Sequence, residues 1–362
     1  MKVMYDGEIF SSQKVGGISR YFIDLASNMS ETEKVYFQIR KSKNLYYDEY
    51  EQIHSPFIRR LRVIKKIKKL FNPEFLRLIY LWVLRPDILH LTYYNTRFLK
   101  LKPKKTKVVV TVHDMIHELF PEQFSQKDRT SNNKREAVEL ADIVIAISNQ
   151  TKKDLISFFN LNESKVSVVY HGCMFSNTFD ESIKITLPKL FVLFVGSRAG
   201  YKNFKFFIHS VSELILEEGV QVVCAGGGSF NQDEVNFLDE LGINQFVNQY
   251  FFSDLELKIA YKKSLCLVYP SLYEGFGLPI LEAWSLETPL VLSRASCFPE
   301  IAGDGALYFE PGDGEMISDH IRFIMSNKSA VEPVIIGKER LKQFSIRNMV
   351  KATKNVYENA YK

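Results

Sequence analysis

The sequence predicts an α/β protein made of two doubly wound domains, each a parallel sheet covered by helices on both faces. Two observations support this fold class. Short apolar runs of strand length alternate with longer amphipathic segments along the whole chain, which is typical of parallel sheets. The alternation stops in a polar run at 176–188 and then restarts, and 362 residues are enough for two cores. We therefore place one domain at 1–175 and a second at 185–343.

The first domain begins with an expected strand at 2–5, a loop that ends at Gly16 and Gly17, and a helix over 18–29. A strand, a glycine pair and a helix form a geometry in which backbone N–H groups can approach an anion closely. A simple helix cap explains the same pattern equally well. Neither the dinucleotide fingerprint G-x-G-x-x-G nor a P-loop occurs in the sequence.

The next part of the chain is basic, and both of its clusters of cations lie in the N-terminal half. A strand is expected at 34–39 and a polar, tyrosine-rich loop at 40–56, and 58–71 has the pattern of a basic amphipathic helix. Such a helix fits an anionic membrane surface, and it fits equally well a solvated face on the protein's own core. A second cluster of lysines lies at 100–107. The cations of the first cluster are Arg59, Arg60, Arg62, Lys65, Lys66, Lys68 and Lys69.

The rest of the first domain alternates regularly. The strand expected at 107–112 runs directly into His113, at the edge where open α/β sheets bind ligands, so His113 is a candidate site residue. A histidine held only for structure is the alternative. His117 could pair with it on a metal, but no third ligand is apparent and no metal is expected. The other expected elements are strands at 87–91, 142–147 and 165–170, a helix at 132–140 and a helix capped by Ser148.

The second domain opens with an expected strand at 190–195 and a loop that carries Arg198 and Lys202. Two cations on a glycine-bearing loop after a strand suit a diphosphate, since arginine offers a planar fork and lysine a point charge. Two surface cations are the alternative. Further strands are expected at 221–225, 249–252, 265–269, 289–292 and 306–309.

A glycine loop after the strand at 265–269 is the main candidate for a ligand-binding loop in this domain. It leads into a helix whose core face includes Trp284. Backbone N–H groups and the helix dipole converge there, which favours phosphate. Glu274 and Glu282 flank the loop and suit hydrogen bonds from neutral hydroxyls, because carboxylates repel phosphate. The loop itself is Gly275, Phe276, Gly277 and Leu278.

Glu274 and Glu282, with Gly-Phe-Gly-Leu-Pro between them, resemble the paired-glutamate motif of retaining glycosyltransferases of family 4. Further blocks match in order, including the ten residues that start at His113, and the resemblance covers nearly the whole chain. It implies the GT-B fold, two Rossmann-like domains that face each other across a cleft. It also implies that a C-terminal helix at 344–362 packs back onto the N-terminal, acceptor-side domain.

The resemblance further implies roles for single residues. Glu274 and His113 are the catalytic candidates and face the donor sugar, while Glu282 holds the nucleotide ribose. Arg198 stands one position later after its strand than in the commonest form of the family. The remaining donor-binding residues, which surround the phosphates, are Gly16, Gly17, Arg198, Lys202, Gly275, Phe276, Gly277 and Leu278.

The implied activity is retaining, metal-independent transfer of a sugar from a nucleotide sugar to a saccharide acceptor carried on a lipid. The loop around Arg198 and Lys202 is most similar to bacterial mannosyltransferases of O-antigen and capsule assembly, which favours GDP-mannose as donor. A UDP-sugar is the alternative donor. An epimerase of nucleotide sugars and a non-catalytic protein that binds a membrane surface are the alternative functions. No cofactor beyond the donor is expected, and no Asp-x-Asp occurs.

Composition sets broader bounds. Hydrophobic residues make up 46% and charged residues 25%, as in ordinary globular proteins, and the net charge is +5. The four cysteines form no C-x-x-C pair, the N-terminus lacks a signal-peptide layout, and no long apolar stretch occurs. We therefore expect a cytoplasmic protein, peripheral at the inner face of the membrane. Nucleic acid is not an expected partner, because the basic segment lacks interleaved aromatic residues.

Overall fold

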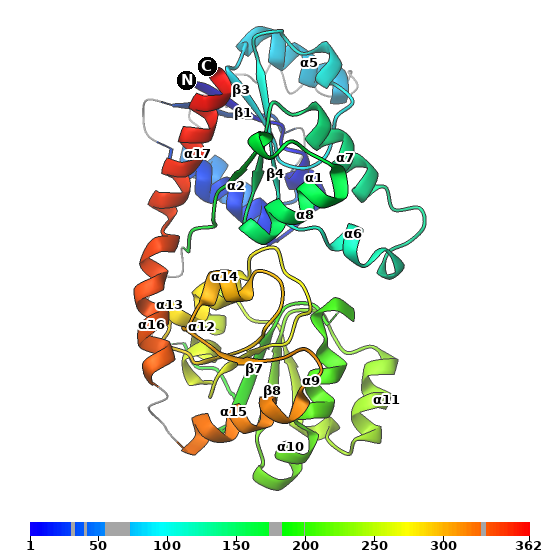
Figure 1. The fold of residues 1–362 in the computed structure, drawn as a ribbon, viewed down its shortest axis with the longest axis vertical. Coiled ribbons are helices and arrows are strands. Elements are labelled where there is room, and N and C mark those ends of the chain that lie inside the picture. Colours follow the sequence, from blue (N-terminus) through cyan, green and yellow to red (C-terminus); the bar gives the residue numbers. More distant parts are fainter. Residues whose placement is uncertain (30–32, 40–41, 55–72, 174–182, 199, 327–330) are drawn as a thin grey trace. The chain divides into compact units, whose positions relative to one another are not determined.

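The computed structural model confirms two parallel α/β sheets of six strands each within the described part of the chain (Figure 1). The chain divides into two compact units, the first formed by Met1–Gly172 with Ile346–Lys362 and the second by Cys173–Ser345. The basic helix expected at 58–71 lies outside the described residues, as does the first part of the polar run. The described residues are 1–29, 33–39, 42–54, 73–173, 183–198, 200–326 and 331–362.

The sheet of the first unit has the strand order β2-β1-β3-β4-β5-β6, and all pairs are parallel. The middle strands are buried almost throughout, since helices cover both faces of such a sheet. Its elements are β1 (Lys2–Tyr5), α1 (Glu8–Ser12), α2 (Gly17–Ser27), β2 (Lys34–Phe37), α3 (Leu45–His54), α5 (Pro73–Leu84), β3 (Ile88–Leu91), η2 (Leu99–Leu101), β4 (Lys107–Val112), α6 (Ile116–Leu119), η3 (Pro121–Gln123), α7 (Thr130–Leu140), β5 (Ile143–Ala146), α8 (Asn149–Phe159), η4 (Glu163–Lys165), β6 (Val166–Val168) and α17 (Ile346–Tyr361).

Helix α17, from the far end of the chain, belongs to the first unit and packs against β4, β5 and α2 (Figure 1). A buried polar contact supplements its apolar face. The hydroxyl of Tyr357 lies 2.7 Å from Nδ1 of His90 and 3.2 Å from the hydroxyl of Tyr5. Burial lowers the pKa of His90 to about 3, so its ring is neutral at physiological pH and bonds to the hydroxyls of Tyr357 and Thr111 without the cost of a buried charge.

The prediction of a loop at 40–56 is wrong, because this segment contains the helix α3. Tyr47 on this helix is buried, and its ring lies 5.4 Å from the ring of Phe10. The side-chain oxygen of Asn44 accepts the backbone N–H of Tyr47 at 3.1 Å and so supports the first turn. Contacts with distant aromatic residues stabilise this helix, and its polar, tyrosine-rich sequence does not reveal them.

The sheet of the second unit has the order β12-β11-β10-β7-β8-β9, again all parallel. Strand β9 begins two residues before the expected strand at 249–252. The elements are β7 (Phe191–Val195), η5 (Gly200–Lys202), α9 (Phe204–Ser210), α10 (Ser212–Glu218), β8 (Gln221–Ala225), α11 (Gln232–Glu240), η6 (Asn244–Phe246), β9 (Val247–Tyr250), α12 (Asp254–Lys263), β10 (Leu267–Tyr269), α13 (Leu278–Ser285), β11 (Leu290–Ser293), α14 (Phe298–Ala302), β12 (Leu307–Phe309), α15 (Gly314–Ser326), α16 (Val331–Leu341) and η7 (Lys342–Phe344).

Helix α13 is firmly anchored in the second unit. Trp284 on it is fully buried, and its indole N–H donates to the carbonyl of Gly305 at 3.0 Å. Helix α16 packs on α13, and Gly337 lets its backbone approach the Trp284 ring, where any larger residue would collide. This packing fixes the position of the helix that carries Glu282.

Candidate functional site

The loop between β10 and α13 places Glu274 at the carboxyl edge of the second sheet. Gly277, at the N-terminus of α13, has φ = 91°, a conformation that side chains disfavour. Two side chains from the loop after β11 brace Glu274 through its carbonyl: the hydroxyl of Ser296 donates to it at 2.7 Å, and the thiol of Cys297 at 3.1 Å. The glutamate is 8% exposed, so it is largely shielded from solvent.

Lys202 and Glu274, which are far apart in the sequence, form an ion pair with 2.5 Å between Nζ and Oε1. Their side chains are 12% and 11% exposed. The ammonium also lies 5.3 Å from the ring centre of Tyr201 and 5.6 Å from that of Tyr269. Burial, and then the neighbouring Glu274 carboxylate, raise the pKa of Tyr269 well above its usual value. The structure therefore brings together one predicted phosphate ligand and one predicted sugar ligand.

Glu282 lies on α13, and the hydroxyl of Tyr261 on α12 donates to its carboxylate at 2.8 Å. Tyr261 is fully buried, and burial together with this carboxylate raises the pKa of the phenol well above its usual value. Glu282 itself is half-buried. An ionised carboxylate accepts several hydrogen bonds, so a partly exposed one held by Tyr261 can still accept vicinal hydroxyls such as those of a ribose.

The first turn of α13 supplies backbone donors. Among the described residues no side chain caps this turn, and it contains no acidic residue. The N-terminus of a helix carries unpaired N–H groups and a partial positive charge, which favour an anion. The predicted phosphate loop of Gly275, Phe276, Gly277 and Leu278 therefore lies where a phosphate would be stabilised, beside the Lys202–Glu274 pair.

Arg198 is bound by protein groups of the second unit. Its guanidinium binds Glu234 on α11 through two nitrogens, at 2.6 and 3.2 Å. It also donates to the carbonyls of Gly226 and Gly228, at 3.2 and 3.0 Å, and its side chain is 3% exposed. Burial alone would raise the pKa of Glu234, but hydrogen bonds from Arg198 and from the backbone of Asn231 lower it overall. Arg198 thus holds the glycine loop after β8, and its predicted phosphate role stays a prediction.

His113 lies in the first unit, directly after β4. Its ring packs edge-on against Tyr21, with 5.1 Å between centres, and lies 5.5 Å from the ring of His171. Burial, and then His171, lower the pKa of His113 well below its usual value, so the ring is neutral. The Nε2 atom is buried and has no hydrogen-bond partner among the described residues. A buried polar atom without a partner is costly, so this atom is suited to a ligand's hydroxyl.

Gly16 and Gly17 lie at the start of α2, also in the first unit. Gly17 is the first helical residue, and the carbonyl of Gly16 accepts the hydroxyl of Ser19 at 2.9 Å. No side chain caps this helix within the described chain. The site residues predicted from the sequence therefore fall into two groups. Gly16, Gly17 and His113 lie in the first unit, and all the others lie in the second.

Several residues of the second unit's site had no signal in the sequence. Tyr261 donates a hydrogen bond to the carboxylate of Glu282. Ser296 donates to the carbonyl of Glu274, and Glu234 forms an ion pair with Arg198. Each partner lies more than twenty residues away along the chain, in an element whose own pattern is that of an ordinary helix or loop. Among the described residues, no cluster of three or more His, Cys, Asp or Glu side chains is arranged to hold a metal. The expected metal independence stays a prediction.

Comparison with protein families gives two matches that together span most of the chain. Residues 176–345 match the family described as Glycosyl transferases group 1. Residues 15–173 match the family described as Glycosyltransferase Family 4. The boundary between the matches coincides with the boundary between the two compact units.

Individual relatives are similar over comparable lengths. The chain is 26% identical to O-antigen chain mannosyltransferase B of Escherichia coli over 94% of this chain and 96% of the relative. It is 29% identical to O-antigen chain mannosyltransferase RfbU of Salmonella typhimurium over 61% of this chain and 62% of the relative. The solved structure of HepE from Anabaena in complex with UDP-glucose matches with a TM-score of 0.71 at 17% identity, over 99% of this chain and all of that chain. This last likeness shows the fold alone, and it confirms the expected fold class.

Proposed function

Because this chain belongs to the group 1 and family 4 glycosyltransferases, we propose that it transfers mannose from GDP-mannose to a lipid-linked saccharide, with retention and without a metal. The choice of mannose is supported by the similarity to O-antigen mannosyltransferases. A UDP-sugar is the alternative donor. Family membership favours neither the epimerase nor the non-catalytic alternative.

The observation that carries the proposal is the arrangement of Lys202, Glu274 and Glu282 around the N-terminus of α13. The diphosphate lies on the helix N-terminus and Lys202, the ribose on Glu282, and the mannose toward Glu274. In the reaction the acceptor hydroxyl oxygen bonds to the anomeric carbon, and the bond from that carbon to the phosphate oxygen breaks. GDP leaves with both electrons of this bond, stabilised by the cation and the helix dipole, and takes up the hydroxyl proton. Catalysis is therefore mainly electrostatic.

Hydrolysis of the donor, a slow transfer to water, tests donor, stereochemistry and metal independence together. We expect proton NMR of the protein with GDP-mannose and excess EDTA to show GDP and α-mannose, because the donor is α-linked and the reaction retains configuration. The α anomer should appear first and the β anomer only later, by mutarotation. Initial formation of β-mannose would contradict retention. Restoration of an otherwise absent reaction by Mg²⁺ or Mn²⁺ would contradict metal independence.

The lipid carrier implies contact with a membrane surface, and α5 supports this part of the proposal. Phe75, Ile79, Trp82 and Val83 on this helix are 49%, 39%, 53% and 76% exposed. The indole N–H of Trp82 donates to the carbonyl of Leu101, which is 60% exposed and lies among the lysines of the second basic cluster. Exposed apolar and aromatic residues beside cations suit an anionic lipid surface. In the described part of the chain, no helix has both the length and the apolar character required to cross a bilayer.

Vesicle flotation tests the membrane contact. We expect the protein to float with phosphatidylglycerol vesicles and not with phosphatidylcholine vesicles, because each basic residue near an anionic surface contributes about 1 kcal/mol. Val83→Glu should abolish flotation, since it places a carboxylate at an exposed apolar position. Phe251→Glu, at a 75% exposed position in the second unit, is the matched control and should float like the parent. Equal flotation of both variants would rule out α5 as the contact.

A further inference from the structure

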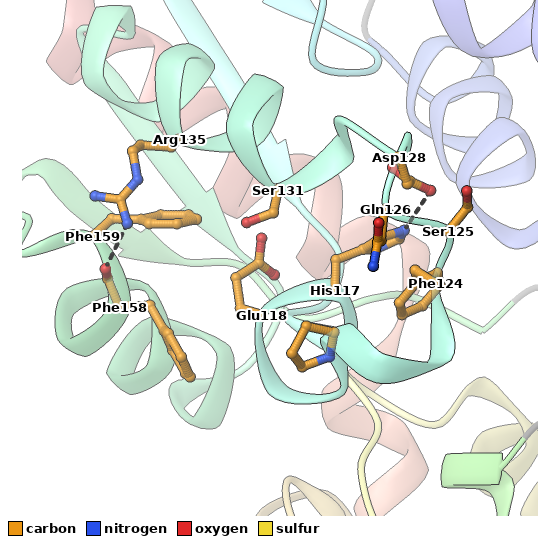
Figure 2. Close-up of a pocket in the computed structure, with 11 residues that line it drawn as sticks. His117, Glu118, Phe124, Ser125, Gln126, Asp128, Ser131, Arg135, Phe158 and Phe159 are labelled. Atoms are coloured by element: carbon orange, nitrogen blue, oxygen red, sulfur yellow. Dashed lines mark hydrogen bonds and ion pairs between the residues drawn. The ribbon is translucent and has the colours of Figure 1, made fainter.

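The first unit contains a pocket of about 500 Å³ outside the predicted site (Figure 2). It lies between α6, the segment that follows it, α7 and α8, and neither His113 nor the glycine pair lines it. Its volume falls within the range of roughly 300–1,000 Å³ that is typical of small-molecule sites. The pocket is formed wholly within one compact unit, so its shape does not depend on the other.

Aromatic side chains form much of the wall. The ring of Phe124 is stacked on His117, with 3.9 Å between ring centres and 21° between planes. Phe158 lines the pocket while 39% exposed, and Phe159 lies beneath the guanidinium of Arg135 at 4.8 Å. Figure 2 shows Phe158 and Phe159 on one side of the pocket and Phe124 with His117 on the other. Flat rings on opposite walls suit a ligand with apolar faces, such as a sugar ring.

Two polar atoms of the pocket residues have no hydrogen-bond partner among the described residues: Nδ1 of His117 and Oε1 of Glu118. The other carboxylate oxygen of Glu118 accepts the buried Lys134 at 2.7 Å, and the Glu118 side chain is 3% exposed. Nε2 of His117 faces the carboxylate of Asp128 at 3.7 Å. Buried polar atoms are normally paired, so each unpaired atom points to a missing partner. Ligand hydroxyls can supply that partner to both, because a hydroxyl donates as well as accepts.

The charge of the wall distinguishes among polar ligands. Glu118 and Asp128 are carboxylates, and Arg135 is the cation among the residues that line the pocket. The Arg135 guanidinium is itself held by the carbonyl of Phe158, at 3.3 Å. Carboxylates repel a phosphate but accept hydroxyl groups well. A neutral, hydroxyl-rich ligand therefore fits this pocket better than an anion does.

The pocket is joined to the predicted site through the loop after β4. Nζ of Lys134 donates to the carbonyl of Asp114 at 2.9 Å and to Glu118, so one buried cation ties the residue after His113 to the pocket wall. We propose that the pocket binds a neutral sugar residue of the acceptor saccharide, other than the residue that receives the transferred sugar. The inference rests on the proposed function, since it is this function that makes the saccharide an acceptor.

Ligand-observed NMR tests the pocket directly. The probes are the methyl α-glycosides of mannose, glucose, galactose, N-acetylglucosamine and rhamnose, each with the parent protein saturated with GDP so that the donor site is filled. We expect at least one glycoside to show saturation transfer. Phe158→Ser should weaken its binding about fivefold to tenfold, because an exposed stacking ring is lost. Ser131→Phe should abolish binding, because the new ring fills the pocket. Phe251→Ser, an exposed aromatic of the second unit, should bind like the parent.

Two results would overturn the proposal: no glycoside binds the parent, or binding is unchanged in both Phe158→Ser and Ser131→Phe. Phe158 is partly exposed, so its replacement is not expected to prevent folding. Stabilisation of these variants by GDP-mannose provides a separate readout of the donor site. If pocket binding fails while GDP-mannose still stabilises the parent, the pocket proposal is wrong and the proposed function stands. If a glycoside binds but no donor does, the proposed function is wrong.

Discussion

Lys202→Met is expected to lower kcat for donor turnover by about 10²–10³-fold, while the protein stays folded. Methionine keeps the length of the side chain but removes the cation that stabilises the departing diphosphate, and loss of one such group typically has this effect. It also leaves the Glu274 carboxylate, only 11% exposed, without its ion-pair partner. Release of GDP from GDP-mannose measures the effect, and a circular dichroism melt checks folding.

Two matched variants make this result specific. Lys205→Met removes an exposed lysine three residues further on and should leave kcat unchanged. Lys202→Arg keeps the charge with a different shape and should recover only part of the activity, because a planar fork does not replace a point charge. Turnover by Lys202→Met within threefold of the parent, roughly 0.6 kcal/mol, would show that this cation does not act on the leaving group.

Arg198→Met is expected to destabilise the second unit by about 3–5 kcal/mol. Removing one partner of a buried pair leaves an uncompensated charge, here on Glu234, and the carbonyls of Gly226 and Gly228 lose their donor. Urea unfolding followed by the fluorescence of Trp284 measures this unit, with Trp82→Phe as the background because these are the two tryptophans of the chain. For a urea m-value of about 2 kcal/mol/M, the midpoint should fall by roughly 1.5–2.5 M.

The same experiment contains its controls. Arg322→Met breaks a pair that is 41% exposed on the arginine side and should cost no more than about 1 kcal/mol. The double variant Arg198→Met with Glu234→Leu should recover much of the loss, because it removes the unpaired charge as well. Equal midpoints for Arg198→Met and Arg322→Met would show that Arg198 does not hold the loop. Its guanidinium would then be available to a phosphate, as the family resemblance implies.

Local physical chemistry made much of the fold predictable. The apolar runs at 107–112 and 221–225 became β4 and β8 with the same bounds, because a fully buried strand leaves a continuous apolar signature. Ser148 caps α8, accepting the backbone N–H of Thr151 as its position before the helix predicted. These features depend on neighbouring residues alone. The helix α3 was missed because its stabilising contacts are with aromatic residues distant in the chain.

The candidate site divides in the same way. The glycine loop and its two glutamates lie close together in the sequence, so the sequence alone predicts them as candidate site residues. The pairing of Lys202 with Glu274 and of Arg198 with Glu234 depends on how strands that are distant in sequence lie in one sheet. No local pattern distinguishes a cation that faces a ligand from one that holds a loop. The pocket of the first unit likewise combines His117 with Phe158 from another helix, so the sequence carried no signal for it.

The most direct test of the central claim, that the loop before α13 binds a GDP-sugar, is a titration of thermal stability in EDTA. At 100 times its dissociation constant, GDP-mannose should stabilise the second unit by about 2.7 kcal/mol, which raises the Tm of this unit by roughly 5–10 °C. Glu282→Ala should lose this shift, and Glu287→Ala, an exposed glutamate just after the same helix, should keep it. Stabilisation by UDP-glucose with no response to GDP-mannose would contradict the proposal that the donor is a GDP-sugar. An undiminished Tm shift in Glu282→Ala would contradict the assignment of Glu282 to the donor site.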